Sequence, residues 1–120
     1  MPDFGYLHTL VTAGGVTQLT FDRAILLTGA AAASYAKAHK TDIADGYIIQ
    51  NDNPLIRTWT VSPTAVVTGS IQLSGQVAAT PSTVVALQAW IAAHGKNYLP
   101  VDLYYDKADA VTKISEVYFP

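Results

Sequence analysis

The most regular pattern of apolar and polar positions in this chain runs from residue 65 to residue 79. Alternate positions carry Ala, Val, Ile, Leu or Gly, and the positions between them carry mostly hydroxyl and amide side chains. This period of two predicts one long strand, or two strands that bend at Gly69 or Gly75. Its polar face comprises Thr68, Ser70, Gln72, Ser74 and Gln76. Because natural edge strands usually carry Lys or Pro against unwanted pairing, we expect this uncharged strand either to be central in its sheet or to pair with a neighbouring chain.

A helix is predicted at about residues 82–94. Ser82 can cap it, because a hydroxyl accepts a hydrogen bond from an unpaired backbone N–H, and Gly95 suits the left-handed residue that closes a helix. One face is apolar and comprises Val84, Leu87, Trp90, Ile91 and His94. The opposite face comprises Val85, Ala86, Ala89, Ala92 and Ala93. A surface helix usually has a charged outer face, so we expect this alanine side to be covered within the domain or by another chain, with Ala86, Ala89 and Ala93 as candidate contacts.

Further β-prone runs are bounded by turn residues. They lie at residues 6–12, 16–21, 47–50, 55–61, 98–105 and 111–119. Gly14 and Gly15 favour a tight hairpin between the first two runs, and residues 106–109 are expected to form another between the last two. The sequence 51–54 is expected to form a turn, and Pro63 is expected to end the fourth run. The chain is therefore expected to form a single α+β domain over residues 1–120, with a mostly antiparallel sheet.

A second helix is indicated before residue 40, and its start has two interpretations. Asp22 is a possible N-cap for a helix from Arg23 to about His39. Gly29 interrupts this segment, so the alternative is a strand at residues 25–27 followed by a helix from Ala30 to His39. Residues 29–34 are all small, which lets another backbone approach closely, and we expect them to pack on the sheet of the same domain.

The chain carries few charges for its length. Only 13% of its residues are charged, against roughly 25% in average soluble domains, and half are hydrophobic. The uncharged surface between neighbouring charged side chains approaches the patch size that usually marks a protein interface. The net charge of −2 gives no case for nucleic-acid binding. No signal peptide and no apolar run of about 20 residues is recognisable, so we expect synthesis in the cytoplasm and no membrane association.

No motif in the sequence indicates catalysis, a cofactor or a metal. The three histidines share no ligand spacing, the calcium-loop and phosphate-loop patterns are missing, and no serine lies in a G-x-S-x-G elbow. With no Cys there is neither a disulfide nor a thiolate site. A carboxylate pair of the glycosidase kind stays open, although the pattern singles out no pair, and Glu116 lies in a predicted strand. We therefore expect a protein without enzymatic activity.

The whole chain resembles, in texture, the small structural proteins of tailed-bacteriophage virions, such as head-decoration, neck, tail and baseplate subunits. The resemblance lies in the Ala/Thr/Val/Gly-rich, Lys-poor composition and in the uncharged polar face of residues 68–76. It implies a β-rich structural subunit that binds copies of itself or other structural proteins, without catalysis, and that resides in the virion. The expected contact surfaces are the polar strand face, the alanine side of the 82–94 helix and the terminal residues Tyr118 and Phe119.

Two alternative functions remain open. A small α+β enzyme or ligand-binding domain would have a pocket between its sheet and the 82–94 helix, lined by Trp90 and Tyr98 with Asp102 or His94. An accessory protein that binds one partner would be a monomer with a single apolar patch. A cavity that holds a titratable group with a perturbed pKa would favour the first alternative.

Overall fold

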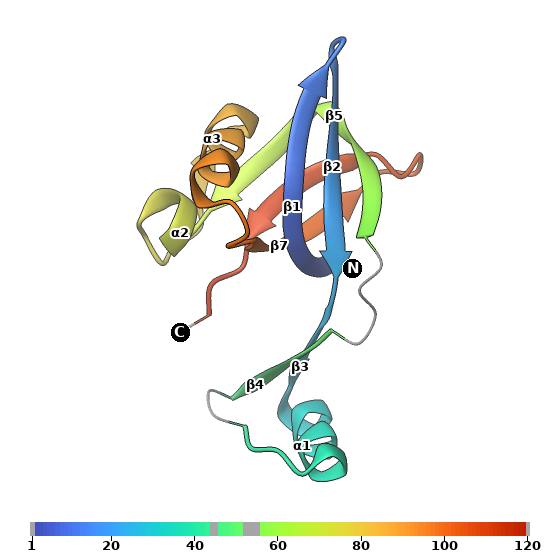
Figure 1. The fold of residues 1–120 in the computed structure, drawn as a ribbon, viewed down its shortest axis with the longest axis vertical. Helices are drawn as coiled ribbons and strands as arrows, with labels where there is room; N and C mark the ends of the chain where they lie inside the picture. Colours follow the sequence, from blue (N-terminus) through green and yellow to red (C-terminus); the bar gives the residue numbers. More distant parts are fainter. Residues whose placement is uncertain (1, 44–45, 52–55, 120) are drawn as a thin grey trace.

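The computed structural model describes residues 2–43, 46–51 and 56–119 (Figure 1). Its elements follow one another as β1 (Asp3–Ala13), β2 (Val16–Arg23), β3 (Ile25–Thr28), α1 (Gly29–His39), β4 (Tyr47–Gln50), β5 (Ile56–Gly69), α2 (Ile71–Ser74), β6 (Thr80–Ser82), α3 (Val84–His94), β7 (Leu99–Tyr105) and β8 (Val111–Glu116). Strands thus precede, separate and follow the helices, which confirms the predicted α+β class. Apart from Asn51, the turn expected at residues 51–54 lies outside the described residues.

Within the described residues, five strands close into a barrel in the order β2-β1-β7-β8-β5, and β5 pairs back onto β2. Strand β6 adds to β5 outside this ring. The pairs are antiparallel except for β5 and β8, which run parallel, so the expected mostly antiparallel sheet is confirmed. The first hairpin turns at Gly14 and Gly15, whose φ angles of 59° and 77° are left-handed and suit glycine.

The core is formed by the inward-facing side chains of the barrel strands. Alternation along β7 buries Leu99, Val101 and Leu103, as expected for a strand with one face in a core. Helix α3 packs against β1 and β5 and inserts Leu87, which is fully buried. The best-defined predicted helix is therefore present, and its apolar stripe covers the barrel.

The prediction of strand throughout residues 65–79, as one strand or as two that bend at Gly69 or Gly75, is wrong beyond Gly69. Strand β5 begins earlier, passes through Pro63 with an irregular register between Val61 and Val66, and ends at Gly69. The chain then forms the short helix α2, turns at Gly75 with a φ of 76°, and returns as β6. Pro63 does not end the strand, because a strand that is irregularly paired there does not need the missing N–H.

Residues 24–43 and 46–51 form an arm that projects from the barrel (Figure 1). In it, β3 and β4 pair as an antiparallel two-stranded sheet, and α1 packs against both. The shorter of the two interpretations of this helix is confirmed, since Arg23 still belongs to β2 and α1 begins at Gly29. None of the helices in the described ranges is both long and apolar enough to cross a membrane.

Candidate functional site

Helix α3 separates the two predicted faces, but its cap is one residue later than expected. Thr83 is the N-cap, and its Oγ1 accepts a hydrogen bond of 3.0 Å from the Ala86 N–H. Ser82 instead belongs to β6. The predicted contact residues Ala86, Ala89 and Ala93 are exposed in this chain, and the neighbouring Val85 is 74% exposed. No other element of the described chain covers this alanine side.

The predicted polar strand face does not exist as one surface. The hydroxyl of Thr68 donates to Ser115 Oγ at 2.7 Å, and Thr68 pairs with both β6 and β8, so it lies on no free edge. Ser70 is only 3% exposed, and its hydroxyl donates to the Val77 carbonyl. Gln72 and Ser74 lie in α2, and Gln76 follows it.

Hydrogen bonds to Glu116 explain why the chain leaves the sheet after Gly69 and forms α2. Its Oε1 accepts from the backbone N–H groups of Ser70 and Leu73 at 2.6 and 2.9 Å, and its Oε2 accepts from Gln72 N–H at 2.9 Å. These charge-assisted bonds hold the first turn of α2 in place of a strand ladder. The strand pattern was therefore overridden by a side chain more than forty residues further along the sequence.

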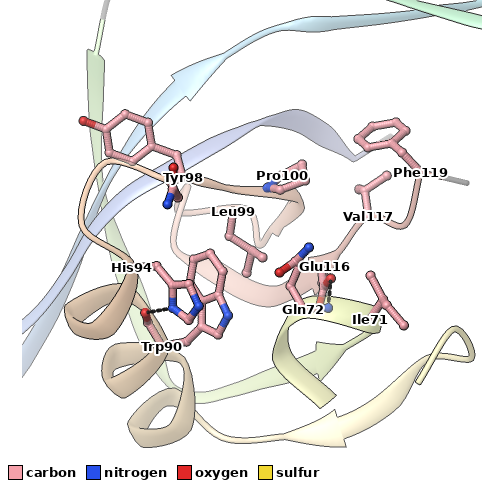
Figure 2. A pocket seen from close by; sticks show the side chains of 11 residues that line it. Ile71, Gln72, Trp90, His94, Tyr98, Leu99, Pro100, Glu116, Val117 and Phe119 are labelled. Carbon is pink, nitrogen blue, oxygen red and sulfur yellow. Dashed lines mark hydrogen bonds between the residues drawn. The ribbon is translucent and has the colours of Figure 1, made fainter. Parts of the chain in front are cut away.

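A cavity of about 460 Å³ lies between α2, α3, the start of β7 and the C-terminal segment (Figure 2). Trp90, His94 and Tyr98 line it together with Gln72 and Glu116. The pocket of the alternative hypothesis thus exists near the expected helix. Asp102 is not part of it, because this residue lies further along β7, opposite Phe4 of β1. Burial, and then the charge of Asp3, raise the pKa of Asp102 above its ordinary value.

The polar groups of this cavity are largely committed to the fold. His94 Nδ1 lies 2.7 Å from the Trp90 carbonyl oxygen, and because a carbonyl oxygen can only accept, Nδ1 is the donor in this hydrogen bond. The two rings stack with centroids 3.9 Å apart. Glu116 is the only carboxylate among the described lining residues, and both its oxygens are occupied. A glycosidase-like pair of carboxylates is not assembled in this cavity.

A second depression, of about 350 Å³, lies where the barrel, the base of the arm and the loop after α3 meet. It is lined by Tyr6, His8, Asp22, Asn51, Lys96 and Tyr98. The His8 and Tyr98 rings stack with centroids 3.6 Å apart. Asn51 Nδ2 donates to Asp22 Oδ2 at 2.9 Å, whereas Asp22 Oδ1 is buried without a hydrogen-bond partner among the described residues.

Local electrostatics at this depression follow from burial. Burial lowers the pKa of His8, and the nearby Asp22 carboxylate opposes this shift. Burial, followed by Tyr47 and Asp22, raises the pKa of Tyr6. The sequence pattern gives no sign of this group of residues, because they come from four separate segments. The register irregularity between Leu7 and Thr9, which places His8 beside the depression, leaves no signal in the sequence.

The predicted terminal contacts have different surroundings. Tyr118 is 37% exposed. Phe119 instead stacks on Tyr47 of the arm at 4.7 Å and meets Phe4 of the barrel edge-on at 5.9 Å. Phe119 therefore connects the arm to the barrel within one chain.

The arm buries very little of its own surface. Among its described residues, only Ala24 and Ala32 are buried. Ile25 is 53% exposed, and Ala31 and Ala33 of α1 are also exposed. Helix α1 packs on β3 and β4, the two-stranded sheet of the arm, and among residues 29–34 only Ala32 is buried.

No cluster of three or more His, Asp or Glu side chains suited to a metal ion occurs in the described part of the chain. Comparison with protein-family models, curated proteins and solved structures finds no match.

Proposed function

We propose that this protein is a non-enzymatic structural subunit that associates with copies of itself or docks into a larger protein assembly. The observation that carries this proposal is the arm, which extends from the barrel with almost all of its described residues at least partly exposed. The texture-level resemblance to tailed-bacteriophage proteins adds that the assembly is a virion.

An arm of this kind is poorly stabilised by its own contacts. An isolated two-stranded hairpin is marginal in water, and a helix as short as the 11 residues of α1 is marginal as well. The arm joins both, and its described contacts to the barrel include the Tyr47–Phe119 stack and the Asn51–Asp22 hydrogen bond. A neighbouring subunit that packs against the arm would stabilise it, because Ile25 and the alanines of α1 would be buried in the interface.

The alanine side of α3 offers a second uncharged surface. Ala86, Ala89 and Ala93 let another backbone approach closely, and Val85 contributes a larger exposed apolar side chain. Substituting a charged residue on either surface should weaken association through that surface while the barrel core stays intact.

The test is the mass of the native chain in solution, by light scattering over about a hundredfold range of concentration. We expect a concentration-dependent oligomer. The double variant Ala31→Glu/Ala33→Glu should lower its mass, whereas Gln18→Glu/Ala108→Glu, at exposed barrel positions, should not. A native monomer at every concentration would contradict self-association. An oligomer unaffected by the arm variant would contradict the arm as its contact.

The cavity beside α3 favours a second candidate function, small-molecule binding. It has the size and the mixed lining of ligand pockets, with His94 Nε2 and the Gln72 side chain as polar groups among apolar ones. A fragment screen by ligand-observed NMR should then find compounds that Ile71→Trp, a filling substitution at the cavity wall, displaces. A screen without such compounds contradicts this candidate.

A further inference from the structure

We propose that the depression lined by Tyr6, His8, Asp22, Asn51, Lys96 and Tyr98 is a binding site for a neutral saccharide. This inference is independent of the association proposed above. It starts from the convergence of six polar or aromatic side chains from β1, β2, the base of the arm and the loop between α3 and β7.

The depression contains polar groups whose hydrogen-bonding capacity is not used. Within the described residues, the only hydrogen bond among these side chains joins Asn51 to Asp22. Asp22 Oδ1 has no donor although it is buried, and leaving a buried acceptor unpaired is costly. The Lys96 ammonium and the Tyr6 hydroxyl make no hydrogen bond to a described side chain. Asp22 Oδ1 has almost no accessible surface, so a ligand in the depression would bond to the Lys96 ammonium and the Tyr6 hydroxyl instead. One of these groups is a donor and the other can donate or accept, and a sugar hydroxyl can do both.

The depression also presents an aromatic surface. His8 and Tyr98 stack almost face to face, with an interplanar angle of 8°. Tyr98 nevertheless remains 37% exposed, and Figure 2 shows its ring directed away from Trp90 and His94 of the larger cavity. An exposed aromatic ring beside hydrogen-bonding groups offers an apolar surface for the C–H face of a sugar ring.

Charge favours a neutral ligand. The Asp22 carboxylate and the Lys96 ammonium line the same depression and carry opposite charges. Burial lowers the pKa of His8, which keeps the imidazole uncharged at neutral pH. An anionic ligand would be repelled by the Asp22 carboxylate, and a cationic ligand would be repelled by the Lys96 ammonium. A free amino acid would match both charges, but it would leave the tyrosine hydroxyl and the aromatic pair without partners.

The experiment is saturation-transfer-difference NMR on the full chain with glucose, galactose, mannose and N-acetylglucosamine as probes, each at millimolar concentration. We expect at least one of these sugars to bind. Tyr98→Ala should weaken that binding about tenfold, and Asp22→Asn should weaken it as well. Tyr98 is exposed, so its variant is expected to fold even if Asp22→Asn does not.

Matched controls keep the result specific. Tyr118 is as exposed as Tyr98, at 37%, but lines neither depression, and Asp42 is an exposed aspartate outside both. Tyr118→Ala, Asp42→Asn and the cavity-filling Ile71→Trp should leave binding unchanged. The free amino acid alanine serves as a further probe, for the rival ligand class. The proposal is overturned if none of the sugars binds, if the Tyr98→Ala variant binds them as the native chain does, if Ile71→Trp abolishes binding, or if free alanine binds and the sugars do not.

Discussion

At the scale of single residues, Glu116 holds the backbone that follows β5. It is the only Glu in the sequence, and its carboxylate accepts three backbone N–H groups at the start of α2. We expect Glu116→Ala to lower the free energy of unfolding by about 3 kcal/mol, because buried donors lose a charged partner. Urea denaturation measures this, with the exposed Asp42→Ala as a control that should change it by less than about 0.5 kcal/mol. Equal effects of the two substitutions would contradict this role.

Gly5 is required by close packing between β1 and β2. A Cβ at this position would overlap the Asp22 carbonyl oxygen and lie 2.7 and 2.8 Å from atoms of the Phe21 ring. Since Phe21 is fully buried and cannot move away, Gly5→Ala should destabilise the protein by about 2 kcal/mol or more. At Gly69 the nearest atom to a new Cβ would be Leu73 Cβ, at 3.0 Å, which is a milder conflict than the overlap with backbone at Gly5. A thermal melt should therefore show a smaller loss for Gly69→Ala, and the opposite order would refute the packing argument.

His8 makes stability depend on pH. Burial lowers its pKa in the folded chain below the ordinary value of 6.5. As the pH falls through 6.5, the unfolded chain takes up a proton that the folded chain does not, so the free energy of unfolding falls. His8→Phe keeps an aromatic ring against Tyr98 and removes this titration. Melting curves on both sides of pH 6.5 should show a steeper acid loss for the native chain, and parallel losses would be inconsistent with a lowered pKa of the partly buried His8.

At the scale of elements, α3 allows two neighbouring hydroxyls to be compared. Thr83 Oγ1 accepts from the Ala86 N–H, whereas Ser82 lies in β6 and does not cap the helix. Thr83→Ala should lower the free energy of unfolding by about 1 kcal/mol, the usual cost of a lost N-cap. Ser82→Ala should cost clearly less in the same denaturation experiment. A larger loss for Ser82→Ala would mean that the helix begins where the sequence pattern placed it.

Elements that are determined by residues close together along the chain could be predicted from the sequence. The glycine pair at residues 14–15 requires positive φ, and the hairpin at residues 106–109 is closed by Asp106, whose carboxylate accepts from the Ala108 and Ala110 N–H groups. Residues 65–79 were misread because their period of two continues past Gly69, where Glu116 holds the backbone in α2. A tertiary hydrogen bond has no local signature, so no pattern within that segment could have revealed it.

The candidate sites were predictable only in part, for a similar reason. Trp90 and His94 lie one helical turn apart, so their stacking follows from the predicted helix. Tyr98 was placed in the larger cavity, and the structure shows that its ring also forms the second depression with His8. The pairing of Tyr6 with Asp22 across two strands brings the remaining groups together, and that register could not be inferred from the residues alone.

At the scale of the whole molecule, the arm dominates the shape. The chain measures 49 × 30 × 26 Å, and Figure 1 shows the arm at one end of its long axis. A barrel closed by hydrogen bonds exposes few strand edges, whereas β3 and β4 form only a two-stranded sheet in the described residues. The barrel is closed by its own hydrogen bonds, whereas the arm has little support within the chain. An assembly contact on the arm would supply that support.

The most direct test of that contact is amide hydrogen exchange in dilute and in concentrated protein. Association through the arm predicts fast exchange of β3, α1 and β4 amides in dilute solution and marked protection of the same amides when the protein is concentrated. Amides of β7 and β8 in the barrel should be protected to the same degree in both. Arm amides that exchange at the same rate at both concentrations would contradict the arm as an assembly contact.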